Sequence, residues 1–121
     1  MQVYDLQLQK ELPIETITSE FLTQIQKNNL ERICIGREPK PIQPNDGIIT
    51  IIRFATTVSR THCIIEKDEM GRLVLFDTKS TYGTSINGIK IEPCKKIYIK
   101  KEDIITLAPK QKNGDYKIQL L

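Results

Sequence analysis

Hydrophobic and polar residues alternate in short runs along most of this chain. In VYDLQLQ, Tyr4, Leu6 and Leu8 share one face, and the polar residues between them share the other. A period of two residues is typical of a half-buried β-strand. Comparable runs, several of them rich in β-branched residues, recur at short spacing. We therefore expect further strands at residues 30–35, 47–53, 61–66, 72–77, 84–86, 89–91, 95–99, 103–108 and 115–121.

Turn residues separate these runs and indicate how they are connected. Asn87-Gly88 lies between two apolar runs and favours a two-residue hairpin, because both turn positions require a positive φ. The charged segment KDEMG at residues 67–71 predicts a second hairpin. Strands joined in this way predict an all-β sandwich or barrel. Residues 17–29 fit either a helix or a single strand.

The segment REPKPIQPND at residues 37–46 contains three prolines and must form a loop. It is long for a connection within a sandwich. Long loops on a rigid scaffold often carry function. We therefore expect this loop either to extend a binding face or to bulge from the domain.

The length and composition are those of one globular domain. With 121 residues, 39% of them hydrophobic and 27% charged, the chain can form its own core. No apolar run approaches the roughly 18 residues of a membrane span, and the first residues carry no secretory signal. Three widely spaced cysteines without a CxxC pair predict reduced thiols and no metal site. We expect a monomer without cofactors, in the nucleus or cytoplasm, with the nucleus favoured.

The net charge of +3 and the single histidine restrict the chemistry. A mild, dispersed positive charge permits an anionic partner without requiring nucleic acid. Ser59 and His62 are three residues apart, a spacing that suggests a nucleophile and its base. The chain has no G-x-S-x-G elbow, no second histidine and no phosphate-loop motif. We therefore expect a binding module rather than an enzyme.

Three polar loops lie at strand ends, namely Gly36-Arg37, residues 59–62 and residues 80–83. In a β-sandwich, such loops can gather at one end of the two sheets. Guanidinium groups, hydroxyls and turn amides together suit a tetrahedral oxyanion. Taken singly, each residue also has a structural interpretation, as a solvated arginine or a serine that tightens a turn. The groups that the loops would present together come from Arg37, Arg60, Ser59, Ser80 and Thr81.

The segments IGRE, VSRTHCIIE and DTKSTYGTSING occur in this order across residues 35–88. They resemble the pattern of the forkhead-associated (FHA) domain family, which has Gly-Arg, then Ser-Arg-x-His, then Asp-x-x-Ser-x-Asn-Gly-Thr with a trailing Asn-Gly. The resemblance implies a two-sheet β-sandwich of the FHA type with its ligand loops at one end. It also implies that residues 1–121 form a single FHA domain, which we expect to be the N-terminal module of a longer protein.

The resemblance further implies that the domain binds phosphothreonine peptides and performs no catalysis. Arg37 would contact the phosphate, Ser59 would donate its hydroxyl to it, and Gly36 would let the backbone turn toward the ligand. His62 would brace the Ser59 loop without touching the ligand. The expected phosphopeptide-binding residues are Arg37, Ser59, Arg60, Thr81 and Tyr82. The expected supporting residues are Gly36, His62, Gly83, Asn87 and Gly88.

Tyr82 departs from the family pattern, because the family most often has Asn at this position. The Asn amide bonds the peptide main chain as both donor and acceptor, and a phenol cannot reproduce both bonds. Tyr-Gly-Thr is similar to the nibrin-like branch of the family, which serves DNA-break repair. We expect binding of a phosphothreonine-containing partner in signalling, cell-cycle control or the DNA-damage response, without direct contact to nucleic acid or membrane. The alternatives are a drifted domain with phosphate-independent contacts and the regulatory domain of a protein kinase.

Overall fold

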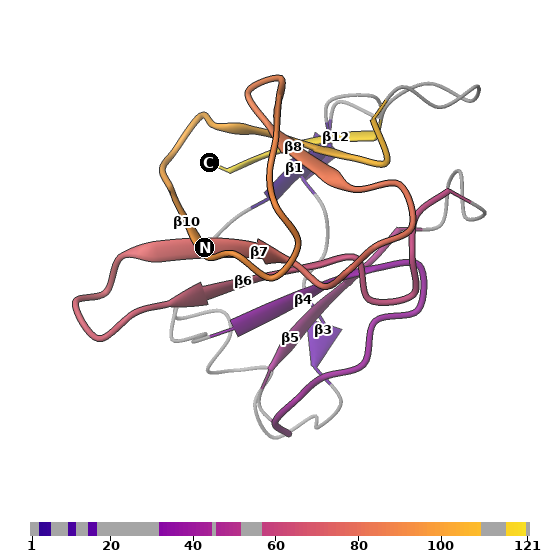
Figure 1. Ribbon diagram of the computed structural model, residues 1–121. Helices are drawn as coiled ribbons and strands as arrows, with labels where there is room; N and C mark the ends of the chain where they lie inside the picture. The colour runs from indigo at the N-terminus through magenta and orange to yellow at the C-terminus, as the bar shows by residue number, and fades with distance from the viewer. Residues whose placement is uncertain are drawn as a thin grey trace.

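Two β-sheets pack face to face in the described part of the chain (Figure 1). The computed structural model describes residues 3–5, 10–11, 15–16, 32–44, 46–51, 57–109 and 116–120. The first sheet has the order β2-β1-β12-β11-β8-β9, and the second has the order β10-β7-β6-β4-β5-β3. Strands of the first sheet are β1 (Val3–Asp5), β2 (Lys10–Glu11), β8 (Thr84–Ile86), β9 (Ile89–Lys90), β11 (Ile104–Leu107) and β12 (Tyr116–Leu120). Strands of the second are β3 (Glu15–Thr16), β4 (Arg32–Gly36), β5 (Gly47–Thr50), β6 (Cys63–Lys67), β7 (Leu73–Asp77) and β10 (Ile97–Ile99).

The hydrophobic core lies between the two sheets and confirms the predicted two-sheet architecture. Alternate residues of the strands point into it, since successive side chains of a strand face opposite ways. Isoleucine dominates the core, as the β-branched runs predict. Fully buried members are Ile33, Ile35, Ile49, Ile65, Leu75, Ile105, Leu107 and Ile118. The expected helix or strand at residues 17–29 lies outside the described residues.

Both predicted hairpin turns are confirmed. Asn87 and Gly88 have φ angles of 51° and 85°, which are the positive values that the β8–β9 hairpin requires. The Asn87 side chain also accepts a hydrogen bond from the Ile104 N–H at 2.9 Å, which fastens the turn to β11. Between β6 and β7, the Asp68 carboxylate accepts hydrogen bonds from the N–H groups of Met70 and Arg72.

The proline-rich loop owes its length to the pairing of the strands that it connects. β4 and β5 are parallel neighbours, with Ile33 opposite Gly47 and Gly36 opposite Thr50. Parallel neighbours need a connection that returns along the whole strand. The Asp46 carboxylate anchors the end of this loop, because it accepts the N–H groups of residues 42 and 43 and pairs with Arg32 at 3.2 Å.

The three cysteines are free thiols, as predicted. Cys34 and Cys63 are buried and Cys94 is exposed. Burial raises the pKa of Cys34 to about 11 and raises that of Cys63 as well. No group of three potential metal ligands occurs among the described residues, and no helix there is long and apolar enough to cross a membrane.

Candidate functional site

The loop that follows β4 lies directly beside the loop that precedes β6. The Arg37 N–H donates to the Ser59 carbonyl at 3.0 Å, and the Glu38 N–H donates to the Arg60 carbonyl at 2.9 Å. These main-chain bonds bring together two motifs that are far apart in the sequence. Arg37 and Ser59 are therefore neighbours in space.

Gly36 makes this close approach possible. An added Cβ at Gly36 would lie 2.0 Å from the Arg60 carbonyl oxygen and 2.8 Å from that of Ser59. Real Cβ atoms do not come this close to backbone atoms, so the segment at Gly36 and the segment at residues 59–60 would have to move apart. Gly36 is the last residue of β4 and is not among the glycines with a positive φ. The structure thus assigns Gly36 to close packing of the backbone, whereas the sequence predicted a turn.

The Arg37 side chain makes one hydrogen bond to the described part of the chain. Its Nε–H donates to the Val58 carbonyl at 3.2 Å, and the residue is half-buried. Within the described part of the chain, no residue accepts from the two terminal nitrogens. A guanidinium fixed in this way can still offer both terminal nitrogens to an oxyanion.

Ser59 connects the second loop to the third. Its Oγ accepts the Thr81 N–H at 3.1 Å, so the hydroxyl hydrogen is still available for donation to a ligand. The Thr81 side chain is exposed beside it. Arg60 has a 73% exposed side chain, and its contact with Glu38 is long, at 4.0 Å. A surface pair of this kind is weak, so Arg60 can turn toward an anion.

His62 joins the same two loops from inside the protein, where it is fully buried. Its Nδ1 accepts the Ser59 N–H at 3.1 Å, and its Nε2 lies 2.7 Å from the Gly83 carbonyl oxygen. Because the Ser59 amide can only donate and the Gly83 carbonyl can only accept, the ring must be neutral with its hydrogen on Nε2. Burial lowers the pKa of His62 below its ordinary value of 6.5, which agrees with a neutral ring. The ring contacts the backbone of Ser59, and the Ser59 hydroxyl is instead bonded to Thr81, which is not the geometry of a nucleophile and its base.

The Ser80 hydroxyl is used within its own loop. It donates to the Asp77 carboxylate and accepts the Gly83 N–H at 3.0 Å. The single hydrogen of the Ser80 hydroxyl is therefore committed to Asp77 and is not available to a phosphate ligand, which can only accept it. Asp77 is 1% exposed, and it also accepts from the Ser80 N–H and from the Thr84 hydroxyl at 2.7 Å. Sequence reasoning gave Asp77 no role, although its Asp-x-x-Ser spacing is typical of a side chain that closes a turn.

Two threonines complete the support of the loops, and the sequence did not single them out. The Thr61 hydroxyl accepts the Lys40 N–H at 3.1 Å, so it ties the proline-rich loop to the site. The Thr78 hydroxyl donates to the Thr61 carbonyl. Lys40, on the proline-rich loop, and Lys79, next to the loop at residues 80–83, are exposed and add positive charge beside the site.

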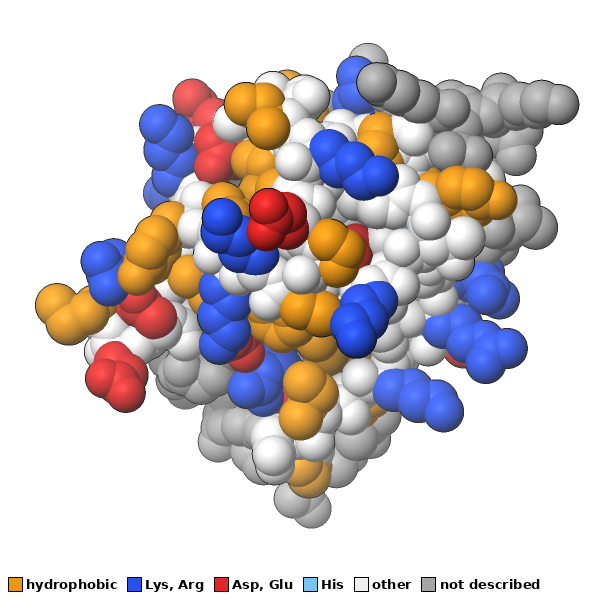
Figure 2. Space-filling model, in the orientation of Figure 1, with side chains coloured by type: hydrophobic (Ala, Val, Ile, Leu, Met, Phe, Trp, Pro, Cys, Tyr) orange, Lys and Arg blue, Asp and Glu red, His pale blue; other side chains and the backbone are white. Residues whose placement is uncertain are grey.

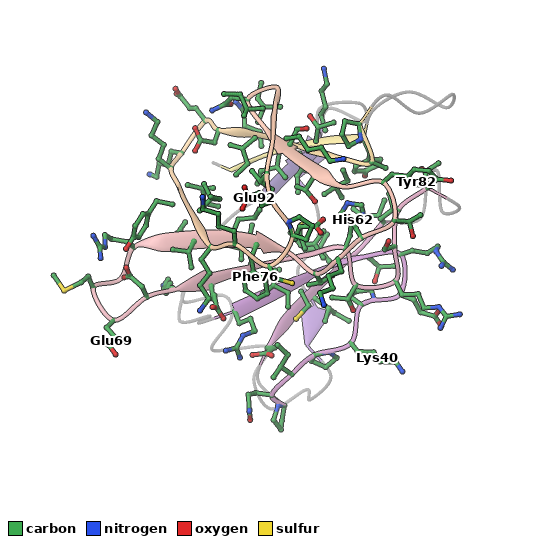
Figure 3. The ribbon with its side chains drawn as sticks, viewed as in Figure 1. Lys40, His62, Glu69, Phe76, Tyr82 and Glu92 are labelled. Carbon is green, nitrogen blue, oxygen red and sulfur yellow. The ribbon has the colours of Figure 1, made fainter. Side chains whose placement is uncertain are left out.

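The three loops lie on one side of the molecule. Lys40, His62 and Tyr82 occupy that side in Figure 3, with Tyr82 41% exposed. The space-filling view shows several basic side chains along the same edge (Figure 2). Guanidinium nitrogens, a free hydroxyl hydrogen and a surplus of positive charge make this end of the sandwich suitable for a tetrahedral oxyanion.

Comparison with known proteins identifies the family. The FHA domain family matches residues 33–108, which include all three loops, and the chain belongs to this family. FHA domains are known for binding phosphothreonine peptides. A search among curated proteins gave no match.

Solved structures show the same fold. The N-terminal FHA domain of S. cerevisiae Rad53p, in complex with a phosphothreonine peptide, is similar with a TM-score of 0.66 and 23% identity, over 98% of this chain and 89% of that one. An engineered FHA domain with a Myc-pTBD peptide has a TM-score of 0.64 and 24% identity, over 98% of this chain and 87% of that one. Full-length yeast Pml1p has a TM-score of 0.60 and 24% identity, over 76% of this chain and 64% of that one. The predicted FHA-type β-sandwich is confirmed.

Proposed function

We propose that this domain binds phosphothreonine-containing peptides of a partner protein through Arg37 and Ser59. The observation that carries the proposal is their adjacency, with terminal guanidinium nitrogens from which no described residue accepts, beside a hydroxyl that can still donate. A phosphothreonine carries about −1.5 to −2 charges at neutral pH, and threonine carries none. Arginine clusters are a recurrent means of recognising such a group.

The other predicted residues take roles that their positions support. Arg60 supplies a second cation, and Thr81 and Tyr82 line the exposed wall next to the phosphate. Gly36 and His62 set the spacing of the loops. Further support comes from the Gly83 turn and the hairpin at Asn87 and Gly88.

We place this activity in signalling, cell-cycle control or the DNA-damage response, in a nuclear protein of which residues 1–121 are one domain. The Tyr82-Gly83-Thr84 sequence supports the nibrin-like branch of the family. The resemblance to the Rad53p domain, which was solved with a phosphothreonine peptide, supports the ligand class. Attachment of this domain to a protein kinase is the alternative setting.

Tyr82 favours one competing function, a drifted FHA domain that contacts its partner without phosphate. The residue replaces an amide that would bond the peptide backbone, and its ring is 41% exposed. An exposed aromatic ring is also a common anchor in protein interfaces.

An oriented peptide library in phosphothreonine, phosphoserine and unphosphorylated versions tests the proposal directly. Wild type should select the phosphothreonine version, and Arg37→Ala should lose roughly 2–5 kcal/mol of that affinity, the usual cost of truncating one partner of a close charge pair. Arg72→Ala is the matched control, because Arg72 is an exposed arginine on the β6–β7 hairpin that already pairs with Asp68. Equal binding of all three versions would establish the drifted domain instead.

A further inference from the structure

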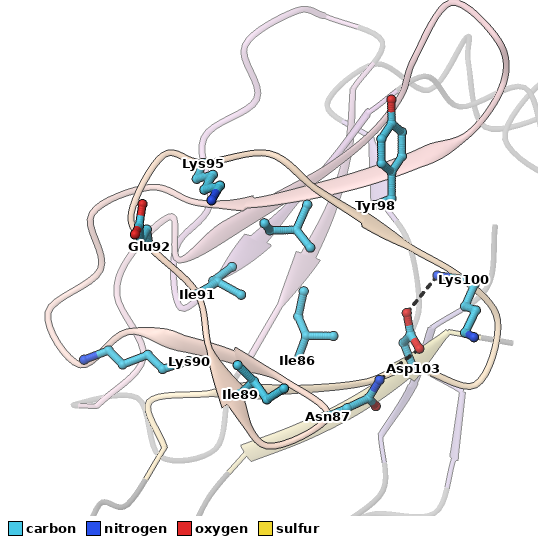
Figure 4. Close-up of a pocket in the computed structure, with 11 residues that line it drawn as sticks. Ile86, Asn87, Ile89, Lys90, Ile91, Glu92, Lys95, Tyr98, Lys100 and Asp103 are labelled. Atoms are coloured by element: carbon cyan, nitrogen blue, oxygen red, sulfur yellow. Dashed lines mark hydrogen bonds between the residues drawn. The ribbon is translucent and has the colours of Figure 1, made fainter.

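A groove lined by isoleucines opens between the end strands of the two sheets. β9 is the last strand of the first sheet and β10 is the outer strand of the second. The groove between them has a volume of about 500 Å³. Ile86 and Ile91 point into it, and Tyr98 and Lys100 stand along its rim (Figure 4). The groove shares none of its lining residues with the three phosphopeptide loops.

Two large apolar side chains at this groove are exposed to water. Ile89 is 73% exposed and Tyr98 is 60% exposed. The Tyr98 ring is held in place, because the Arg72 guanidinium lies 4.6 Å from its centroid. Apolar side chains gathered around a concave surface are typical of a binding site. A binding surface whose side chains are already held in place also lowers the entropic cost of binding.

Lysines outnumber acidic residues along this groove. Residues 90–101 contain five lysines and one glutamate, a net charge of +4 in a chain whose total is +3. Three of these lysines, Lys90, Lys95 and Lys100, line the groove itself, together with two acidic residues, Glu92 and Asp103. The acidic Asp103 is 7% exposed, and its carboxylate accepts from the Asn87 side chain and the Lys100 N–H. A negatively charged occupant is therefore favoured.

The rim of the groove includes a strand edge without a neighbour in the described part of the chain. β10 pairs with β7 through Ile97, Tyr98 and Ile99, and no described strand pairs with its other side. In a strand paired on one side only, every second N–H and C=O points outward. Such an edge can accept an extended peptide as an additional strand.

We propose that this groove binds an extended acidic segment of a partner protein, with large apolar side chains that enter between Ile86 and Ile91. The apolar floor takes those side chains, the lysines face the acidic residues, and the β10 edge pairs with the segment's backbone. A flat membrane surface would not reach a recessed floor. A nucleic acid would leave the isoleucines uncovered. The interaction needs no phosphothreonine and leaves the Arg37 loops free.

Selection from a displayed library of short, random, unphosphorylated peptides on the 121-residue chain tests this proposal. The enriched peptides should combine acidic and large apolar residues. Their affinity should fall at least about tenfold, or 1.4 kcal/mol, for Ile89→Asp and for the double variant Lys95→Glu/Lys100→Glu. All of these positions are exposed, so the variants should fold, and the melting temperature checks that they do.

Matched controls separate the groove from the rest of the surface. Met70→Asp introduces the same charge at a side chain that is 77% exposed and lies outside the groove, and it should leave the affinity unchanged. Lys79→Glu, next to the third phosphopeptide loop, and Arg37→Ala, in the first, should also leave the affinity for the selected peptides unchanged. Loss of affinity in these controls, or none in Ile89→Asp, would overturn the proposal. So would a selection without acidic enrichment, or binding of phosphatidylserine vesicles or duplex DNA through Ile89 while no peptide binds.

Discussion

The buried imidazole of His62 accepts a hydrogen bond from the backbone N–H of Ser59 at 3.1 Å. The ring therefore fixes the main chain of the loop from which the Ser59 hydroxyl projects. Its opposite nitrogen bonds the Gly83 carbonyl, so one side chain sets the distance between two loops. A residue that is fully buried in this way can control a ligand site that it does not touch.

Replacement of His62 by alanine should lower both stability and phosphopeptide affinity. The variant loses two hydrogen bonds and leaves a cavity, for an expected loss of roughly 2–4 kcal/mol in the free energy of unfolding. Chemical denaturation measures the first effect, and titration with the selected phosphopeptide measures the second. Unchanged stability with abolished binding would instead mean that His62 contacts the ligand.

The stability of the domain should decrease as the pH falls below about 6.5, because His62 is neutral in the folded protein. Its folded pKa is lowered by burial, so the unfolded chain binds the proton more readily in this range. The contribution of the neutral ring is fully present above 6.5 and is lost toward the lower, folded pKa. Denaturation midpoints of wild type and His62→Gln, compared from about pH 7 to 5.5, check this. The slope should be smaller in the variant, since His62 is the chain's single histidine.

Two serines of the site should respond differently to substitution by alanine. Ser59→Ala removes a donor to the phosphate and should weaken phosphopeptide binding by roughly 1.5–3 kcal/mol with little change in stability. Ser80→Ala removes one of the donors to the Asp77 carboxylate, which keeps the Ser80 N–H and the Thr84 hydroxyl, and it leaves the Gly83 N–H without its partner. It should cost roughly 1–3 kcal/mol of stability. Calorimetric titration and thermal unfolding of both variants separate the two roles. Equal effects on binding would show that Ser80 also faces the ligand.

Substitution of Gly36 by alanine should disrupt the contact between the first two loops. The new Cβ would meet the Arg60 carbonyl oxygen at 2.0 Å, and overpacking of this kind costs roughly 1–3 kcal/mol or more. Gly71→Ala is the control, because Gly71 has a φ of 78° but an added Cβ meets nothing within 4 Å. The control should lose only the roughly 1–2 kcal/mol of a left-handed residue and keep its phosphopeptide affinity. Retained affinity in Gly36→Ala would contradict the close-packing role.

The substitution Tyr82→Asn restores the residue that the family most often has. If the site binds phosphothreonine peptides in the family's manner, the amide should bond the peptide backbone and raise the affinity by about 1 kcal/mol. Tyr82→Phe is the control, since it keeps the ring and removes only the hydroxyl. A large loss of affinity in Tyr82→Asn would show that the aromatic ring itself anchors the partner, as the drifted domain requires.

The strands and hairpins of this protein could be predicted because they depend on local patterns. Alternation of apolar and polar residues predicted the first and last residues of β6, β7 and β11 to within one or two positions. The Asn87-Gly88 turn follows from the backbone preferences of two adjacent residues. The three motif loops were found from residue type and order. Their packing as neighbours depends on strand pairing across the sheets, which alternation does not specify.

An all-β chain, its turns and the residues able to meet a phosphate follow from the amino-acid sequence. How those residues are used follows from the packing of the folded chain. It placed Arg37 beside Ser59, turned the Ser80 hydroxyl inward to Asp77, and made Gly36 a point of close backbone contact. The tertiary structure also created the isoleucine groove between β9 and β10. These features depend on contacts between residues distant in sequence, whereas a strand or a turn depends on its neighbours along the chain.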